Sequence, residues 1–196
     1  GVDLEVEAAW VTVEGGRRLG LITWATGLGP PGSTLIAPGA TFSVVSVGGG
    51  GGAGGNGGAG GAGGQSDPNK LPSYCAGNGG AGGAGGNGGR GGPGGRVTVR
   101  ATDAALLAVI TASAPGGNGG PGGDGGAGGK KGTEWSGCQG ATNGANGPRG
   151  ATGTWGQAGT VDATLVDASA LTLVPGVLAG APSLTLERRP PPRPPQ

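Results

Sequence analysis

The sequence predicts an all-β fold that carries an inserted bundle of polyglycine-II helices, with almost no α-helix. Glycine supplies 55 of the 196 residues and is concentrated in four tracts. These tracts keep a three-residue period, as in GGAGGNGGAGGAGG from residue 51. Short segments between them show the two-residue alternation typical of β-strands, and no segment has a convincing helical period.

The glycine tracts cover residues 48–64, 77–95, 116–132 and 137–159. A flexible linker has no reason to keep a strict period, whereas three residues per turn is the repeat of the polyproline-II helix, which also serves glycine. This helix has no internal hydrogen bonds, so its buried N–H and C=O groups must pair with other helices. Two glycines per triplet allow close approach, and we expect the third residue to point to solvent. Residues 137–159 have one glycine per triplet, which predicts a peripheral helix with one packed face.

The first strand-like segment, residues 2–13, alternates until Ala8 and Ala9, where the slip predicts a bulge or bend. Asp3, Glu5 and Glu7 are expected on its solvated face. Further strands are expected at residues 19–26, 40–47, 96–101, 106–112, 160–166, 170–174 and 183–186, with a hairpin joining 96–101 to 106–112 and a loop at 28–38. The predicted division is a small β-sandwich-like domain (1–47, 96–115, 160–187), the four-helix antiparallel bundle inserted into it (48–95, 116–159) and a proline-rich tail (188–196).

The chain also shows an internal duplication. The order strand, glycine tract, cysteine loop, glycine tract, strand occurs in residues 40–101 and again in 106–166. If successive tracts run up and down, both cysteine loops fall at the same end of the bundle. Cys75 and Cys138 are then equivalent, which predicts a disulfide between the loops and an extracellular location. Two unrelated free thiols are the alternative.

Composition argues against several kinds of chemistry. There is no His, and two Cys 63 positions apart do not form a zinc cluster. Matches to GxGxxG carry no information in a GGx repeat, so we expect no enzymatic activity, cofactor or metal. A net charge of +1 gives no case for nucleic-acid binding, and no apolar run is long enough for a membrane span. Without a leader or initiator Met, Gly1 is expected to be a processed start.

The triplets of residues 51–64 and 79–92 resemble the glycine-rich repeats of mycobacterial PE-PGRS proteins. They are also similar to the polyglycine-II sandwiches of T-even-like phage tail-fibre adhesins and of snow flea antifreeze protein. The resemblance covers only the four tracts, under half of the chain, and no PE-type helical domain precedes them. It implies a fold for the tracts and says little about function.

The first functional hypothesis is a structural subunit of an extracellular bacterial filament or surface assembly. Copies of this chain would be its partners, joined through β strands and terminal segments. Residues 2–8 form an alternating strand suited to a neighbour's sheet edge, although they also suit an ordinary first strand. The proline tail would dock on another copy or stay solvated. The candidate contacts are Val2, Leu4, Val6, Pro190, Pro191 and Pro192.

The second hypothesis is a receptor-binding adhesin whose tip is formed by the loops at residues 65–76 and 130–136. The candidate contacts with a cell-surface receptor are Lys70, Tyr74, Lys131 and Trp135. A lesser alternative is ice binding by a flat face of the bundle. Ice binding favours regular ranks of Thr or Ala, and the outward positions here are mixed.

Overall fold

The computed structural model describes residues 1–67, 69, 75–135 and 139–187. Within them the fold is mostly strand with very little helix, which confirms the predicted class. The chain divides into two compact units. Unit 1 contains Gly1–Gly49, Pro93–Gly117 and the described residues from Gln157 onward, and unit 2 contains Gly50–Gly92 and Asn118–Gly156.

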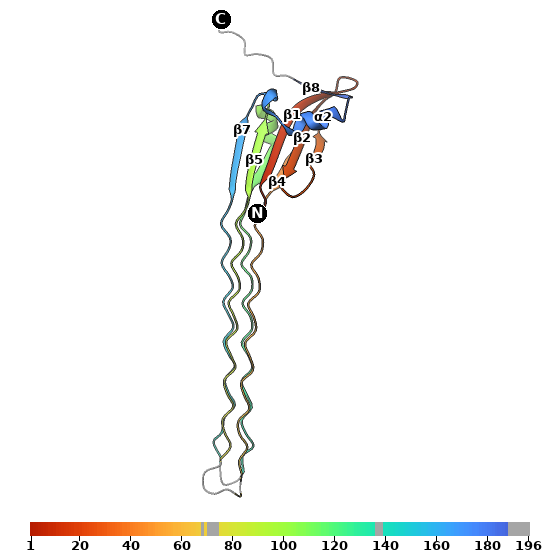
Figure 1. Ribbon diagram of the computed structural model, residues 1–196. Coiled ribbons are helices and arrows are strands. Elements are labelled where there is room, and N and C mark those ends of the chain that lie inside the picture. Colours follow the sequence, from red (N-terminus) through yellow and green to blue (C-terminus); the bar gives the residue numbers. More distant parts are fainter. Residues whose placement is uncertain (68, 70–74, 136–138, 188–196) are drawn as a thin grey trace. The chain divides into compact units, whose positions relative to one another are not determined.

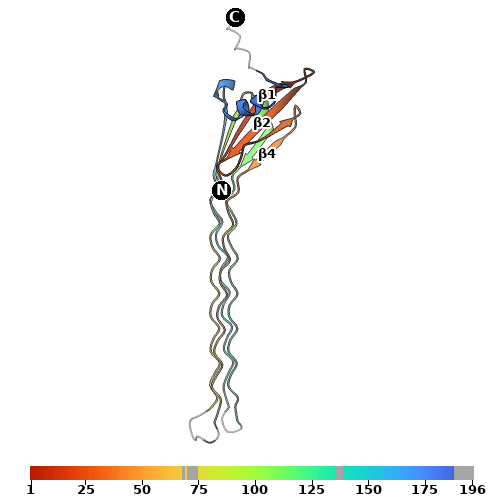
Figure 2. The same ribbon diagram turned by 45° about the vertical axis from the view of Figure 1, so that its right-hand side comes forward.

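Unit 1 is built on a mixed sheet with strand order β3-β2-β1-β5-β7, and β8 pairs with the far end of β1 (Figures 1 and 2). The strands are β1 (Leu4–Val13), β2 (Arg18–Thr26), β3 (Gly32–Ile36), β5 (Arg96–Ala101), β7 (Thr160–Leu165) and β8 (Leu184–Leu186). The first strand is therefore central. It pairs antiparallel with β2 and parallel with β5. Both of its edges are occupied, so the expectation that it could add to a neighbour's sheet is wrong.

Both faces of this sheet are covered at β1 and β2. On one face lie α1 (Ala104–Val109) and a second, parallel two-stranded sheet of β4 (Phe42–Val45) and β6 (Ile110–Ser113), packed over a cluster that includes Val6 and Ala8. On the other face α2 (Leu173–Ala179) packs over a cluster that includes Ala9. Ala8 and Ala9 are both 0% exposed, and the β1–β2 register is unbroken. The apolar pair marks burial on both faces and not the predicted bulge.

Residues 104–109 form a helix, so the strand predicted at residues 106–112 forms only from Ile110, as β6. The Asp103 side chain accepts a hydrogen bond from the Ala105 amide at 2.8 Å, which caps the helix. Leu106 is fully buried against the sheet. The chain thus passes from β5 in the large sheet to β6 in the small one through α1, and the predicted hairpin does not form.

Two further segments differ from the expectation. The predicted loop at residues 28–38 contains β3, which pairs antiparallel with β2; Pro31 precedes the strand and so removes no donor from it. The predicted strand at 170–174 is replaced by a 3₁₀ turn, η1 (Ala168–Ala170), and the start of α2. Pro175 lies in the first turn of α2, where a missing N–H removes no helical hydrogen bond.

A carboxylate from β1 holds the beginning of α2. Glu7 is 0% exposed, so the expectation of a solvated side chain is wrong. Its oxygens accept hydrogen bonds from the amides of Thr172 (2.7 Å), Leu173 (2.6 Å) and Val174 (3.1 Å), and from the Thr172 hydroxyl (3.0 Å). A carboxylate is favoured there because the first amides of a helix lack partners within it. Glu7 therefore anchors the layer that covers this face.

Unit 2 consists of four extended glycine segments side by side (Figures 1 and 2). We call them tract 1 (residues 48–64), tract 2 (77–95), tract 3 (116–132) and tract 4 (139–159), each continuing a few residues into unit 1. Tracts 1 and 2 run antiparallel, with bonds such as Gly80 N–H to Gly61 O at 2.8 Å. Tracts 3 and 4 are also antiparallel, whereas tracts 1 and 3, and tracts 2 and 4, are parallel.

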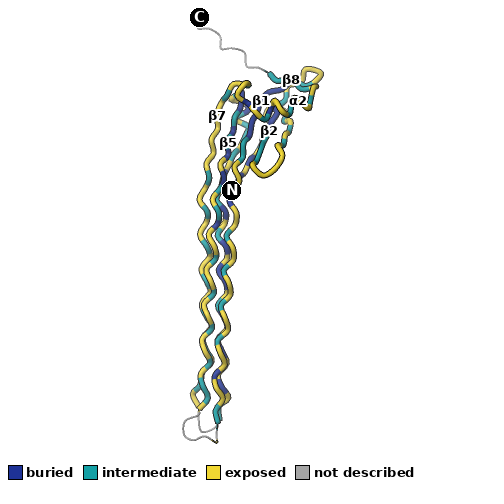
Figure 3. The backbone as a smooth tube through the Cα atoms, viewed as in Figure 1, coloured by how far each residue is buried: buried dark blue, intermediate teal, exposed yellow. Residues whose placement is uncertain are grey.

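These backbone hydrogen bonds recur at every third residue. In tract 1 the amides of residues 51, 54, 57, 60 and 63 donate to the carbonyls of residues 118, 121, 124, 127 and 130 in tract 3. Burial follows the same period. Along tract 4 one half-buried glycine alternates with two exposed residues (Figure 3), so one side of tract 4 is packed.

Asparagine side chains add a second set of contacts in unit 2, although the third residue of each triplet was expected only to point to solvent. An amide oxygen accepts a backbone N–H of a neighbouring tract in five cases. The pairs are Asn56 with Asp124, Asn78 with Thr142, Asn87 with Ala151, Asn143 with Lys131 and Asn146 with Gly128. These exposed residues therefore satisfy backbone donors that the glycine pairing leaves over.

Replacing the buried carboxylate tests its role in unit 1. Glu7→Gln turns one acceptor oxygen into a donor that faces backbone amides, so we expect the free energy of unfolding to fall by about 1–3 kcal/mol. Glu5→Gln is the matched control on the same strand, because Glu5 is 36% exposed and pairs with Arg100. It should lower stability by about 1 kcal/mol or less. Urea unfolding followed by circular dichroism measures both, and equal losses would contradict the anchoring role.

Candidate functional site

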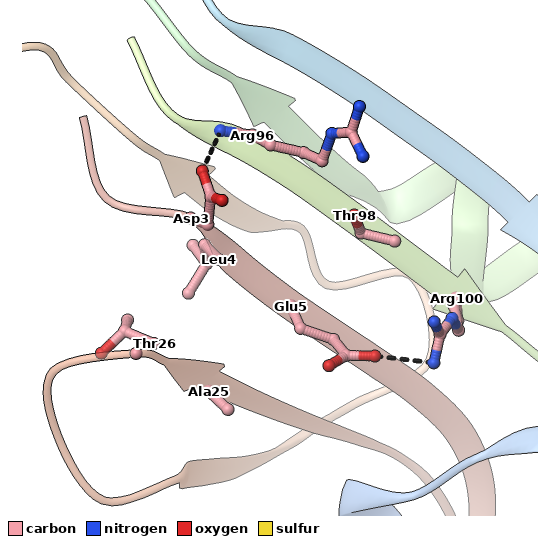
Figure 4. Close-up of a pocket in the computed structure, with 9 residues that line it drawn as sticks. Asp3, Leu4, Glu5, Ala25, Thr26, Arg96, Thr98 and Arg100 are labelled. Atoms are coloured by element: carbon pink, nitrogen blue, oxygen red, sulfur yellow. Dashed lines mark hydrogen bonds and ion pairs between the residues drawn. The ribbon is translucent and has the colours of Figure 1, made fainter.

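A hollow of about 430 Å³ lies over β1, β2 and β5 in unit 1 (Figure 4). Its charged residues are Asp3, Glu5, Arg96 and Arg100. The Arg100 guanidinium lies 2.6 Å from the Glu5 carboxylate, and Asp3 accepts the Arg96 backbone N–H at 2.9 Å. The two acids and the one guanidinium in these contacts are thus engaged within the protein. The Arg96 guanidinium has partners on β7, since its Nε donates to the Thr160 hydroxyl at 3.4 Å and lies 3.8 Å from the Asp162 carboxylate.

The same hollow offers little reactive chemistry. Its hydroxyl groups come from Thr26 and Thr98, and the candidate bases among its lining residues are the carboxylates of Asp3 and Glu5, which make the contacts given above. Among the described residues, no group of three or more acidic, His or Cys side chains could hold a metal ion.

The predicted subunit contacts are distributed differently from the expectation. Val6 is fully buried and Leu4 half-buried in the core of unit 1. Val2 is 41% exposed and lines a smaller hollow of about 250 Å³ together with Val45 and Val47. Pro190, Pro191 and Pro192 lie outside the described residues.

Of the predicted tip contacts, Lys70 and Tyr74 lie outside the described residues, while Lys131 and Trp135 lie within them. Trp135 is half-buried. The Lys131 ammonium is exposed and lies 2.9 Å from the Glu134 carboxylate. That carboxylate also accepts the amides of Gly140 (2.8 Å) and Ala141 (2.6 Å). Glu134 was not anticipated from the sequence. Its carboxylate joins Lys131 to the backbone of Gly140 and Ala141.

Only one of the two cysteines of the predicted disulfide lies within the described residues. Cys75 is described and is not a free thiol, whereas Cys138 lies outside the described residues. The pairing of Cys75 with Cys138 stays a prediction.

The feature that sequence reasoning missed is a row of open glycines on tract 1. At Gly54 an added Cβ would lie 2.0 Å from the Gly86 carbonyl oxygen, so packing requires glycine. At Gly55, the next residue, an added Cβ would meet nothing within 4 Å. The same holds for the second glycine of each of the other triplets in tract 1. We call this set the open row: Gly52, Gly55, Gly58, Gly61 and Gly64.

The other tracts have no equivalent in unit 2. In tract 3 both glycines of a triplet are needed, since a Cβ would lie 1.9 Å from a backbone oxygen at Gly119 and 2.0 Å at Gly120. In tract 4 the outward positions carry side chains, including Trp155, which is 71% exposed. The GGx triplet is the one sequence pattern that could have revealed the open row. It is the same in tracts whose second glycine is packed and in tract 1, where it is not, so the sequence does not distinguish them.

Comparison with known proteins adds no relative: no protein-family model, curated protein or solved structure matches this chain. Neither helix of the described residues is long and apolar enough to cross a membrane.

Adjacent glycines provide a matched pair of variants. Gly54→Ala forces a Cβ against a backbone carbonyl, so we expect unit 2 to lose about 1–3 kcal/mol or more. Gly55→Ala enters open space and restricts the unfolded chain, so it should stabilise a single copy by about 0.4–1 kcal/mol. Thermal unfolding at low protein concentration measures both changes. Similar losses in the two variants would show that the open row is packed within one copy.

The Glu134 carboxylate makes the adjoining loop sensitive to acid. The Lys131 ammonium, with the amides of Gly140 and Ala141, lowers the pKa of Glu134 below its ordinary value. A lowered pKa in the folded state means that the stabilisation is present at neutral pH and is lost as the pH falls through that pKa. The NMR amide shifts of Gly140 and Ala141 should therefore titrate with a midpoint below the usual glutamate range. In Glu134→Gln this transition should vanish; a midpoint at or above the ordinary value would contradict the interpretation.

Proposed function

We propose that this chain is a structural subunit of an extracellular assembly, in which copies pack side by side through the open row of tract 1. The four tracts are proposed to be polyglycine-II helices. Hydrogen bonding at every third residue, exclusively between segments, supports this assignment.

The observation that carries the proposal is that glycine persists where a single copy does not need it. Each open-row position accepts a Cβ without any contact within 4 Å. A glycine at such a position lowers stability by about 0.4–1 kcal/mol relative to alanine, through the entropy of the unfolded chain. Among the described residues of one copy, no contact at these positions requires glycine and so offsets this loss. A second backbone packed against the row would offset it, because only glycine permits that approach.

The backbone of the open row also offers unused hydrogen-bonding groups. The amides of Gly52, Gly55, Gly58 and Gly61 have no partner among the described residues, although the amides of Gly51, Gly54, Gly57 and Gly60 all donate to tract 3. The partner must therefore offer a carbonyl every three residues and no Cβ at the contact. Tract 1 of a second copy meets both conditions, since the carbonyls of its first and third triplet positions have no partner among the described residues either.

An extracellular setting agrees with the sulfur chemistry. Cys75 is not a free thiol, and stable disulfides belong to oxidising compartments. Backbone pairing of this kind also suits a structural role. It supplies many weak bonds along a regular surface and needs no side-chain specificity.

The test is a pair of substitutions on the open row. Gly55→Val with Gly58→Val should leave the circular dichroism of the chain unchanged, because each added side chain starts in open space. The same substitutions should remove the side-by-side contact. Light scattering should then show the average particle mass falling to half of the wild-type value or less at equal concentration.

The matched control places the same side chain on exposed positions of tract 4, as Ala145→Val with Ala151→Val. This variant should keep the wild-type mass. A wild-type mass of 18.0 kDa, one chain, across salt and concentration would overturn the proposal. Equal effects of the two double variants would also overturn it.

A further inference from the structure

Among the residues that the structure describes, β3 and β7 form the two edges of the large sheet of unit 1, and no further strand pairs with either (Figures 1 and 2). All six residues of β7 are exposed, and its pairing with β5 is continuous from Thr160 to Leu165. β3 pairs with β2 without interruption over its five residues. An edge of this kind presents unpaired N–H and C=O groups to any extended chain.

Natural sheets usually protect such edges with a proline, a lysine, a bulge or an inward charge. β7 (TVDATL) contains neither proline nor lysine, and Asp162 is its one charged residue. β3 (GSTLI) contains no charged residue and no proline. Neither register contains a bulge. Both edges are therefore competent for pairing.

The hydrogen bonds between β7 and β5 show which backbone N–H and C=O groups of β7 point away from β5. Val166 N–H donates to the Ala101 carbonyl at 2.9 Å. In a parallel pair, alternate residues direct both backbone groups to the same neighbour. The backbone groups of Val161, Ala163 and Leu165 consequently point away from β5, so three donors and three acceptors are available at two-residue spacing.

We propose that copies of this chain join head to tail, with β7 of one copy pairing in parallel with β3 of the next. Strand direction supports this occupant. β1, β5 and β7 are mutually parallel, and β3 shares their direction because β2 opposes both β1 and β3. A copy added with its sheet faces aligned therefore places β3 parallel to β7, as β7 already lies to β5.

The residues on each face match in this arrangement. Val161, Ala163 and Leu165 lie on the sheet face that holds Val97 and Val99. Gly32, Thr34 and Ile36 lie on that same face, since they pair with Trp24, Ile22 and Gly20. Small and apolar residues thus meet across the joint on this face, while the other face brings Thr160, Asp162 and Thr164 next to Ser33 and Leu35.

Charge disfavours the symmetric alternative. The Asp162 carboxylate lies 3.8 Å from the Arg96 guanidinium in an exposed ion pair. An antiparallel β7–β7 joint centred on Asp162 would bring two of these carboxylates close together, and like charges at adjoining positions destabilise a sheet. The β7–β3 joint has one carboxylate and no opposing charge. Because β7 and β3 are different surfaces, this contact is heterologous and leaves one of each open at the two ends, where further copies can add. The inference deepens the proposed function and rests on it, since it supplies the direction of assembly.

Cysteine trapping tests the joint. Ala163→Cys and Thr34→Cys lie at the centres of the two strands and on the same face. Mild oxidation of the double variant should give a ladder of chain multiples on a non-reducing denaturing gel, which collapses on reduction. Each single variant should stay at the wild-type pattern, because its new thiol faces no second one. A dimer from Ala163→Cys alone, or no ladder from the double variant, would overturn the inference.

A charge pair gives an independent readout. In the Ala163→Cys, Thr34→Cys background, Leu35→Glu should reduce the ladder at least several-fold, because it brings a second carboxylate near Asp162, whereas Val45→Glu, at a similarly exposed residue of β4 (51% against 43%), should not. Adding Thr164→Lys to Leu35→Glu should restore the ladder, since each joint then holds opposite charges. Restoration cannot occur through a β7–β7 contact, and its absence would overturn the inference.

The two proposals are separated by repeating the trap in the Gly55→Val, Gly58→Val background. A ladder that persists there supports the edge joint independently of the open row. A wild-type mass above one chain without any ladder rejects the edge joint alone. A single-chain mass with no ladder rejects both.

Discussion

The structure depends on a backbone hydrogen bond that recurs every three residues between glycine segments. Such a bond needs the two backbones to approach so closely that a Cβ at Gly54 would lie 2.0 Å from a carbonyl oxygen. Ordering a residue costs about 1–2 kcal/mol of backbone entropy, and one hydrogen bond returns about 1 kcal/mol. Unit 2 therefore needs additional bonds. Asn56, Asn87 and Asn146 supply them by accepting amides that the glycine pairing leaves over.

The duplication of the chain explains how so many bonds stay in register. Equivalent segments of the two halves always pair in parallel: β4 with β6, β5 with β7, tract 1 with tract 3 and tract 2 with tract 4. Phe42 pairs with Ile110, 68 positions later, and Arg96 pairs with Thr160, 64 positions later. The segment between the two pairings is thus four residues shorter in the second half, and the triplet register is kept on both sides of that difference.

Each unit has backbone N–H and C=O groups that have no hydrogen-bond partner among the described residues. In unit 2 they lie along the open row of tract 1, and in unit 1 they lie along the sheet edges at β3 and β7. Both surfaces present main-chain groups, which have the same chemistry in every copy. The proposed contacts between copies would therefore require regular spacing more than particular side chains.

The sequence alone determined the mostly-β class with little helix, because strand alternation and the absence of a helical period are local properties. It did not determine the helix at residues 104–109, the edge strand β3 or the burial of Glu7. Glu7 caps α2 across 165 positions of chain, a contact that no local pattern records. The open row has the same cause. A GGx triplet reads alike whether its second glycine touches another backbone or nothing, so only the tertiary structure decides which glycines are needed and which are left over.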